Sequence, residues 1–193
     1  MIFNDVRQGT AVAGASLAAA LLIAGASYAA DITYAVDQTI GGGSVVGTIT
    51  TDGASGTLNG SDIVGWNLEL NGVGASYNLK TTNSNAYVVG SDLTATPKDL
   101  DFNFSGGDNG YLLFQVIEFS GFNYYCDATS AVVCFQGKSV VPQEFDSPSA
   151  QNVPASGNQV IGTAVPEPVT WATMLLGLCA VGGALRSRRF RTA

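Results

Sequence analysis

Apolar residues between positions 30 and 164 recur at every second position, rather than at the three- and four-residue spacing of a helix. This alternation is typical of strands that bury one face and expose the other. Gly, Asn, Asp and Ser interrupt it about every ten residues and supply turns with positive φ angles. Regular short strands of this kind predict an all-β fold, a single β-sandwich or jelly-roll-like domain. The alternating segments are 32–36, 45–49, 66–70, 77–79, 100–104 and 112–116.

Several segments depart from the alternation and carry separate predictions. Turns are expected at 51–53, 71–72 and 106–110, where Gly, Asn and Asp cluster. Ser61 is a good N-cap and predicts one helical turn after it. Pro, Gln, Ser and Asn dominate residues 141–158, which predicts an irregular connection. Val160 and Ile161 are then expected to add a last strand, and residues 162–164 to form a short spacer.

The first 29 residues predict a secretory signal peptide. Arg7 precedes an apolar, Ala-rich run at 10–26, whose centre fits the apolar region of such a signal. Ser27 and Ala29 supply the small side chains that signal peptidase needs at the −3 and −1 positions. Export through the Sec machinery with cleavage after Ala29 follows. The alternative is a retained N-terminal anchor, because Asp5 weakens the positive charge ahead of the run.

The last 29 residues, 165–193, have three parts in a fixed order. Val165, Pro166, Glu167 and Pro168 come first, and residues 169–185 then carry no charged side chain. Seventeen such residues, at about 1.5 Å each, are just enough for a transmembrane helix. A cluster of arginines at 186–191 follows, which the positive-inside rule keeps cytoplasmic. These stop residues are Arg186, Arg188, Arg189 and Arg191.

This order of parts resembles the PEP-CTERM sorting signal. The resemblance implies that exosortase, a membrane-embedded cysteine transpeptidase or protease of Gram-negative bacteria, cuts near the Pro-Glu-Pro at 166–168. It also implies an inner-membrane intermediate, final placement at the cell surface or in the extracellular matrix, and a link to exopolysaccharide and biofilm. Residues 47–68 are similar to the N-terminal half of many uncharacterised PEP-CTERM proteins, which implies no activity. The alternative is an ordinary membrane anchor whose helix starts at the two prolines.

Composition excludes several functions for the exported region, 30–164. The chain has no histidine, so it has no Ser-His-Asp or Cys-His catalytic unit and no imidazole zinc site. The exported region contains thirteen acidic residues and three lysines, a net charge of −10. Such a charge opposes binding to nucleic acid, which needs a clustered basic face. We therefore expect no nucleic-acid partner.

The cysteines predict one disulfide bond. Cys126 and Cys134 are eight positions apart, and an exported protein folds in an oxidising compartment. The alternative, a reactive thiol, has neither a CxxC spacing nor a histidine beside it. Cys179 lies within the apolar tail, where it serves as a small apolar residue.

The remaining polar and aromatic residues leave three kinds of site open. Asp99, Asp101 and Asp108 flank a glycine-rich turn and are candidates for calcium; no other metal or cofactor is expected. An envelope enzyme acting on polysaccharide would need paired carboxylates, with candidates Asp62, Glu69, Asp99, Asp101 and Glu118. A lectin-like face would use exposed aromatic rings, with candidates Tyr111, Phe122, Tyr124 and Tyr125. The expected function is a non-enzymatic surface or matrix protein associated with extracellular polysaccharide.

Overall fold

The described part of the chain folds into two antiparallel sheets. The structure is a computed structural model that describes residues 30–117, 123–142, 150–166, 174–176 and 178–179. The larger sheet contains β1 (Ile32–Ile40), β2 (Gly43–Thr51), β3 (Gly56–Thr57), β4 (Ile63–Gly72), β5 (Ala75–Lys80), β7 (Leu93–Ala95), β8 (Asp99–Asn103) and β13 (Asn158–Ala164). The smaller sheet contains β6 (Ser84–Val89), β9 (Tyr111–Val116), β10 (Tyr124–Ala128), β11 (Gly137–Val141) and β12 (Gln151–Val153).

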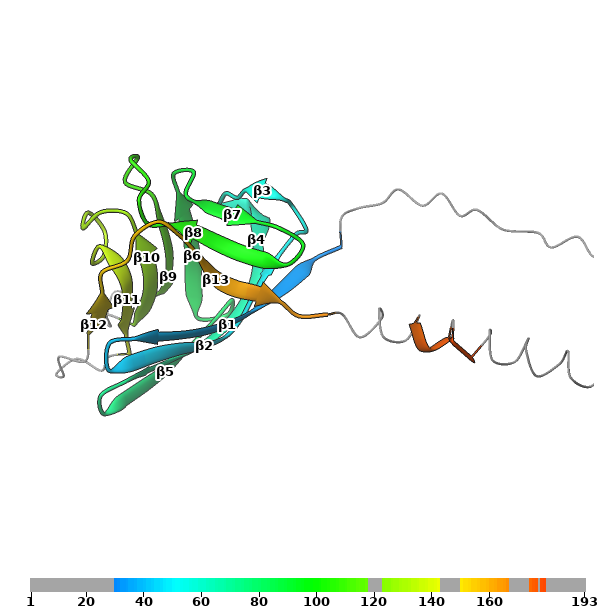
Figure 1. Cartoon of the computed structure of the whole chain (residues 1–193). Coiled ribbons are helices and arrows are strands. Elements are labelled where there is room, and N and C mark those ends of the chain that lie inside the picture. The colour runs from blue at the N-terminus through cyan, green and yellow to red at the C-terminus, as the bar shows by residue number, and fades with distance from the viewer. Residues whose placement is uncertain (1–29, 118–122, 143–149, 167–173, 177, 180–193) are drawn as a thin grey trace, which may run out of the picture.

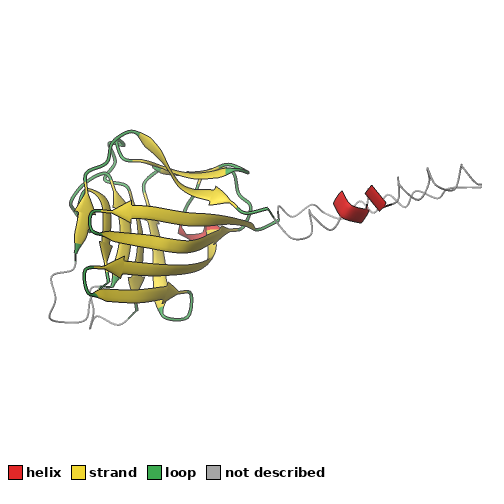
Figure 2. Ribbon diagram, turned by 60° about the horizontal axis from the view of Figure 1, so that its bottom comes forward, coloured by secondary structure: helices red, strands yellow, loops and turns green. Residues whose placement is uncertain are grey.

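The two sheets pack face to face as a sandwich (Figure 1). The strand order is β3-β7-β8-β13-β1-β2-β4-β5 in the larger sheet and β12-β11-β10-β9-β6 in the smaller one. Long strands of the larger sheet run side by side across Figure 2. β11 of the smaller sheet packs against β1, β2 and β4 of the larger one. The all-β prediction is therefore confirmed for the described residues.

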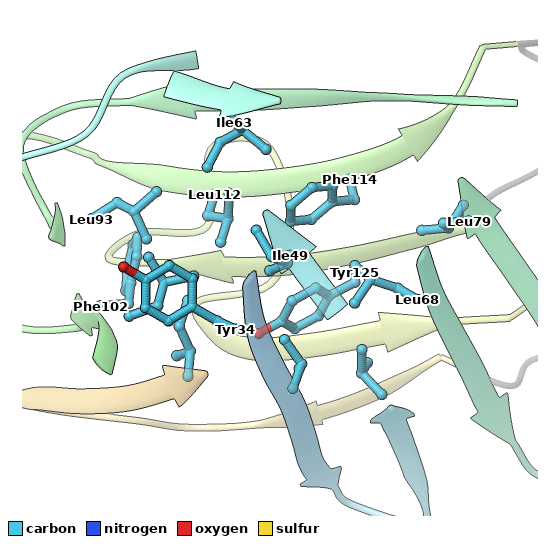
Figure 3. Packing of buried hydrophobic residues seen from close by; sticks show 14 of the residues in the cluster. Tyr34, Ile49, Ile63, Leu68, Leu79, Leu93, Phe102, Leu112, Phe114 and Tyr125 are labelled. Atoms are coloured by element: carbon cyan, nitrogen blue, oxygen red, sulfur yellow. The ribbon is translucent and has the colours of Figure 1, made fainter. Parts of the chain in front are cut away.

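Much of the core is made by the alternating apolar residues that predicted the strands, and Tyr125 adds a residue that the sequence analysis places outside. Tyr34, Ile49 and Leu68 of the larger sheet meet Phe114 and Tyr125 of the smaller one, and all five are fully buried (Figure 3). The rings of Phe114 and Tyr125 are stacked, with their centroids 6.2 Å apart. The Tyr34 hydroxyl donates a 2.7 Å hydrogen bond to the carbonyl of Thr96, so this buried polar group keeps a partner.

Local details differ from the sequence predictions at two turns. The helical turn is a 3-10 turn, η1 (Gly60–Asp62), and its N-cap is Asn59 rather than Ser61. The Asn59 side chain accepts a 2.9 Å hydrogen bond from the amide of Ser61, which satisfies a free donor at the turn's start. The predicted turn at 71–72 lies two residues further on, at 73–74, because Gly72 pairs with Ala75.

The end of the sandwich is also more regular than the sequence predicted. Part of the irregular connection at 141–158 forms β12, whose three residues pair with β11. Val160 and Ile161 do belong to a last strand, β13. That strand continues through residues 162–164, so the predicted spacer is wrong: pairing with β8 and β1 holds these residues in the sheet.

Most of both terminal segments lies outside the described residues. This applies to the predicted signal peptide with Ser27 and Ala29, to Glu167 and Pro168, and to the four arginines. Within the tail, residues 174–176 and 178–179 are helical, and their large apolar side chains are exposed. Among the described residues, no helix has the length and apolar character needed to cross a membrane.

Candidate functional site

The outer face of the smaller sheet is the best candidate for a binding surface. Because side chains alternate along each strand, Tyr87 of β6, Tyr111 of β9 and Tyr124 of β10 all point away from the core. Amide side chains accompany them on the same face, contributed by Asn85, Gln115 and Asn152. We call this surface, defined by these six residues, the tyrosine face. It combines flat rings with hydrogen-bonding groups.

A groove lies over the tyrosine face, beside the loop that follows β10. Its volume is about 450 Å³. Phe135 and Val133 form its loop side and are about half exposed, at 50% and 48%. The other lining residues are Leu113, Gln115, Tyr124, Cys134, Val141 and Ala150. The groove is mainly apolar, with one amide side chain in its lining.

A disulfide bond fixes this loop to the sheet. Cys126 lies on the outer side of β10 and is bonded to Cys134, with their Cα atoms 6.5 Å apart. The predicted disulfide is thus confirmed. The bond holds Val133 and Phe135 beside the sheet, so the groove wall does not depend on loop packing alone.

The tyrosine face has no charge on its strands, although the protein is strongly acidic. On the described strands of the smaller sheet, the charged residues are Asp127 and Lys138, and both face the interior. The outer face of the larger sheet differs, since its strands carry Asp37, Glu69, Lys80, Asp99 and Asp101. The two outer surfaces of the sandwich therefore suit different chemistry.

Asp127 forms a buried polar cluster behind the tyrosine face. Its Oδ2 accepts a 2.6 Å hydrogen bond from the hydroxyl of Tyr125. Lys138 lies opposite Asp127 on β11, and its Nζ donates a 2.6 Å hydrogen bond to Oε1 of Gln38 in the other sheet. Burial raises the pKa of Asp127 to about 7, while the Tyr125 hydrogen bond and the charge of Lys138 act against this rise.

The structure separates the aromatic candidates of the sequence analysis. Tyr111 and Tyr124 belong to the tyrosine face and pack beside the disulfide. Tyr125 is fully buried, so its assignment to an exposed sugar-binding face is wrong. Two adjacent aromatic residues on one strand point to opposite sides, and the sequence does not say which one is inside. Phe122 lies outside the described residues, and Tyr87 was missed.

The calcium candidates are not gathered at one point. Asp99 and Asp101 share the outer face of β8, whereas Asp108 lies in the turn before β9. In the described segments, no three acidic or cysteine side chains come close enough to hold a metal ion together. Asp108 lies instead beside Asp92, which the sequence analysis did not single out. The pKa of Asp92 is raised to about 6, mainly by burial. The hydrogen bond with Asp108 and the negative charge of Asp108 raise it further.

Among the carboxylates considered for glycoside hydrolysis, Asp99 and Asp101 share the outer face of β8, whereas Asp62 and Glu69 lie on other elements. Oδ2 of Asp62 accepts a 2.7 Å hydrogen bond from the amide of Asn59 in the cap of η1. Glu69 lies on β4, four strands away from Asp99 on β8, which is about 19 Å at the usual spacing of strands. Glu118 is outside the described residues.

The start and the end of the folded region lie together at one end of the sandwich (Figure 1). The amide of Val165 donates a 2.8 Å hydrogen bond to the carbonyl of Thr33 on β1. A cavity of about 590 Å³ is formed here by both chain ends and the turn before β8. Its lining includes Ala30, Lys98 and Pro166. The first half of the predicted sorting motif is therefore attached directly to the folded sheet.

No family model, curated protein or solved structure matches this chain. The functional conclusion therefore depends on the motif at the chain's end and on the chemistry of its surfaces. Among the features described above, the tyrosine face and the predicted motif at 165–168 are the ones that fit a binding or assembly role.

Proposed function

We propose that this protein is an exported, non-enzymatic surface or matrix protein that a sorting protease processes at its C-terminal tail. The observation that carries the proposal is the tail itself: Pro-Glu-Pro, an uncharged run at 169–185, and four arginines. Exosortase is the proposed protease, from the resemblance to PEP-CTERM signals. Signal peptidase and the Sec machinery are the proposed partners in export.

Two features of the folded region support this proposal. A disulfide such as Cys126–Cys134 is typical of proteins that fold in an oxidising compartment outside the cytoplasm. Residues 166–168 separate the hydrogen-bonded Val165 from the apolar run, and three extended residues span about 10 Å. A membrane intermediate would hold the motif in this short gap, where two prolines disfavour helix and keep the backbone extended.

The test is a change of Pro166, Glu167 and Pro168 to alanine in the native host. We expect export to continue, because the signal peptide and the arginine stop are unchanged, and release from the inner membrane to fail. The matched control changes three consecutive exposed residues on the sandwich, Lys80, Thr81 and Thr82, to alanine and should leave release unaffected. Release of the Pro-Glu-Pro variant to the same extent as the wild type would contradict the proposal, and a wild type that itself stays in the inner membrane would favour a plain anchor.

A second candidate function, binding of a neutral polysaccharide, is favoured by the tyrosine face. Aromatic rings offer an apolar surface for the C–H faces of sugars, while neighbouring amides and hydroxyls offer hydrogen bonds. The strands of this face carry no charged side chain that points outward. A neutral ligand can therefore cover the face without burying an unpaired charge, which would cost free energy. The groove beside Tyr124 and Phe135 gives such a chain a place to lie.

Pull-down with the neutral exopolysaccharide fraction of the host tests this binding. Tyr124→Ala and Phe135→Ala should each weaken retention about tenfold, if one stacking contact is worth about 1.4 kcal/mol. Val46→Ala is the control, because Val46 is an exposed apolar residue on the outer face of the other sheet. Equal retention of all three variants would contradict binding at the tyrosine face without affecting the sorting proposal.

A further inference from the structure

The turns at one end of the sandwich enclose a carboxylate that lies beside a second carboxylate and has one oxygen without a hydrogen-bond donor. Asp92 lies between β6 and β7 and is only 5% exposed. Its Oδ2 is buried, and no described residue gives it a hydrogen bond. A buried carboxylate in this state costs free energy unless a proton or a cation compensates it. This atom is the reason to look for a ligand here.

Two glycines leave the space that the Asp92 carboxylate fills. A Cβ atom placed on Gly106 would overlap Oδ1, and one placed on Gly110 would overlap Oδ2. Both glycines belong to the turn between β8 and β9, so this turn wraps around the side chain. Any residue other than glycine at either position would have to push the carboxylate aside.

A second carboxylate stands next to the first. Oδ2 of Asp108 accepts hydrogen bonds from the amide of Ser91, at 3.0 Å, and from its hydroxyl, at 3.2 Å. This contact holds Asp108 against the turn that carries Asp92. Within the described ranges, neither carboxylate forms an ion pair with a lysine, and Lys138 is engaged with Gln38 between the sheets. The local negative charge thus lacks a basic side chain to balance it.

We propose that this turn binds one calcium ion between Asp92 and Asp108. Calcium accepts six to eight oxygen ligands in flexible geometry, including carboxylates, main-chain carbonyls and waters. The carbonyl oxygen of Val89 lies nearby, 3.1 Å from where a Cβ atom on Gly110 would be. Magnesium fits less well because it demands near-ideal octahedral geometry. With two carboxylates, the site belongs to the weak extracellular class, with a Kd of about 0.1–1 mM.

Thermal unfolding of the full-length chain in detergent, after treatment with a chelator, tests the site. CaCl2 should raise the Tm of the wild type along a saturating curve with half of the effect at about 0.1–1 mM. Asp108→Asn should weaken the response at least tenfold, and Asp92→Asn should abolish it. Asp101→Asn is the matched control: it removes one carboxylate from the exposed face of β8 and should respond as the wild type does. MgCl2 at equal ionic strength should act more weakly.

The key variant is Asp108→Asn, because Asp108 is exposed and its substitution should not impair folding. A wild type that does not respond to calcium would overturn the proposal and would mean that the two carboxylates share a proton instead. An equal response in Asp108→Asn would overturn it as well, since the effect would then come from the general negative charge of the protein.

Discussion

At the scale of single residues, the interior of the sandwich holds one polar cluster whose balance depends on pH. Asp127 is fully buried, with Tyr125 and Lys138 as the titratable groups that face it. Replacing the hydration of a carboxylate by one hydrogen bond and one nearby cation leaves a net cost, which is why the pKa of Asp127 rises to about 7.

This shift predicts that Asp127 weakens the fold as pH rises. An aspartate has a pKa of about 3.9 in the unfolded chain, so between about pH 4 and 7 the folded state holds a proton that the unfolded state has lost. The free energy of unfolding should therefore decrease across this window, by an amount on the order of a few kcal/mol. Urea unfolding at several pH values should show this slope in the wild type relative to Asp127→Asn. Parallel pH profiles would contradict the assignment.

At the scale of elements, the contact between β2 and β4 requires a residue without a side chain. Gly47 has a φ of +150°, and a Cβ atom there would overlap the main-chain carbonyl of Asn67. The two strands pair along almost their whole length, so the obstruction would fall in the centre of the larger sheet. Backbone atoms cannot move aside as a flexible side chain can.

Gly47→Ala should lower the free energy of unfolding by about 3 kcal/mol, from steric overlap and backbone strain together. Gly107→Ala is the control, because nothing lies within 4 Å of a Cβ atom there. Its effect should stay within about 0.5 kcal/mol. Denaturant unfolding of both variants provides the measurement. A similar free energy of unfolding for Gly47→Ala and Gly107→Ala would contradict the prediction, because it would show that β2 and β4 can move apart to accommodate a Cβ atom at little cost.

The disulfide stabilises one loop and its effect is separable from the rest of the fold. Cys126→Ala combined with Cys134→Ala should cost about 2.5 kcal/mol, the chain-entropy value for so short a loop. Reductant should weaken the wild type to a similar extent and leave the double variant unchanged. Cys179→Ala, outside the sandwich, should not alter stability. A wild type that is insensitive to reductant would mean that the bond does not contribute.

Sequence predicted the strands well wherever apolar residues alternate, as in β1, β2 and β8, because burial of one face imposes this period. It did not predict β3, β6, β7, β10 or β11. Nor did it predict β12, whose Gln151 and Asn152 show no such pattern and which forms because β11 offers an edge. It also missed Tyr87 and Asp92. Tyr87 acquires its role from neighbours on other strands and Asp92 from the turn between β8 and β9, and contacts between segments distant in sequence are not visible in local spacing.

At the scale of the whole molecule, the sandwich has three distinct surfaces. The strands of the tyrosine face carry no charge, and the opposite outer face carries most of the carboxylates that lie on strands. The third surface is the end of the sandwich where Ala30 and Val165 line the same cavity. In a membrane intermediate, the short gap at 166–168 would keep this end near the bilayer and leave both outer faces free. Release would then allow the tyrosine face to meet polysaccharide beyond the membrane.

The most direct measurement is the mass of the mature protein isolated from its own host, together with the cell fraction that contains it. Our account predicts an N-terminus at Ala30 and a C-terminus near Pro168, in material outside the inner membrane. A mature chain that keeps Arg186–Arg191 and remains in the inner membrane would contradict the account.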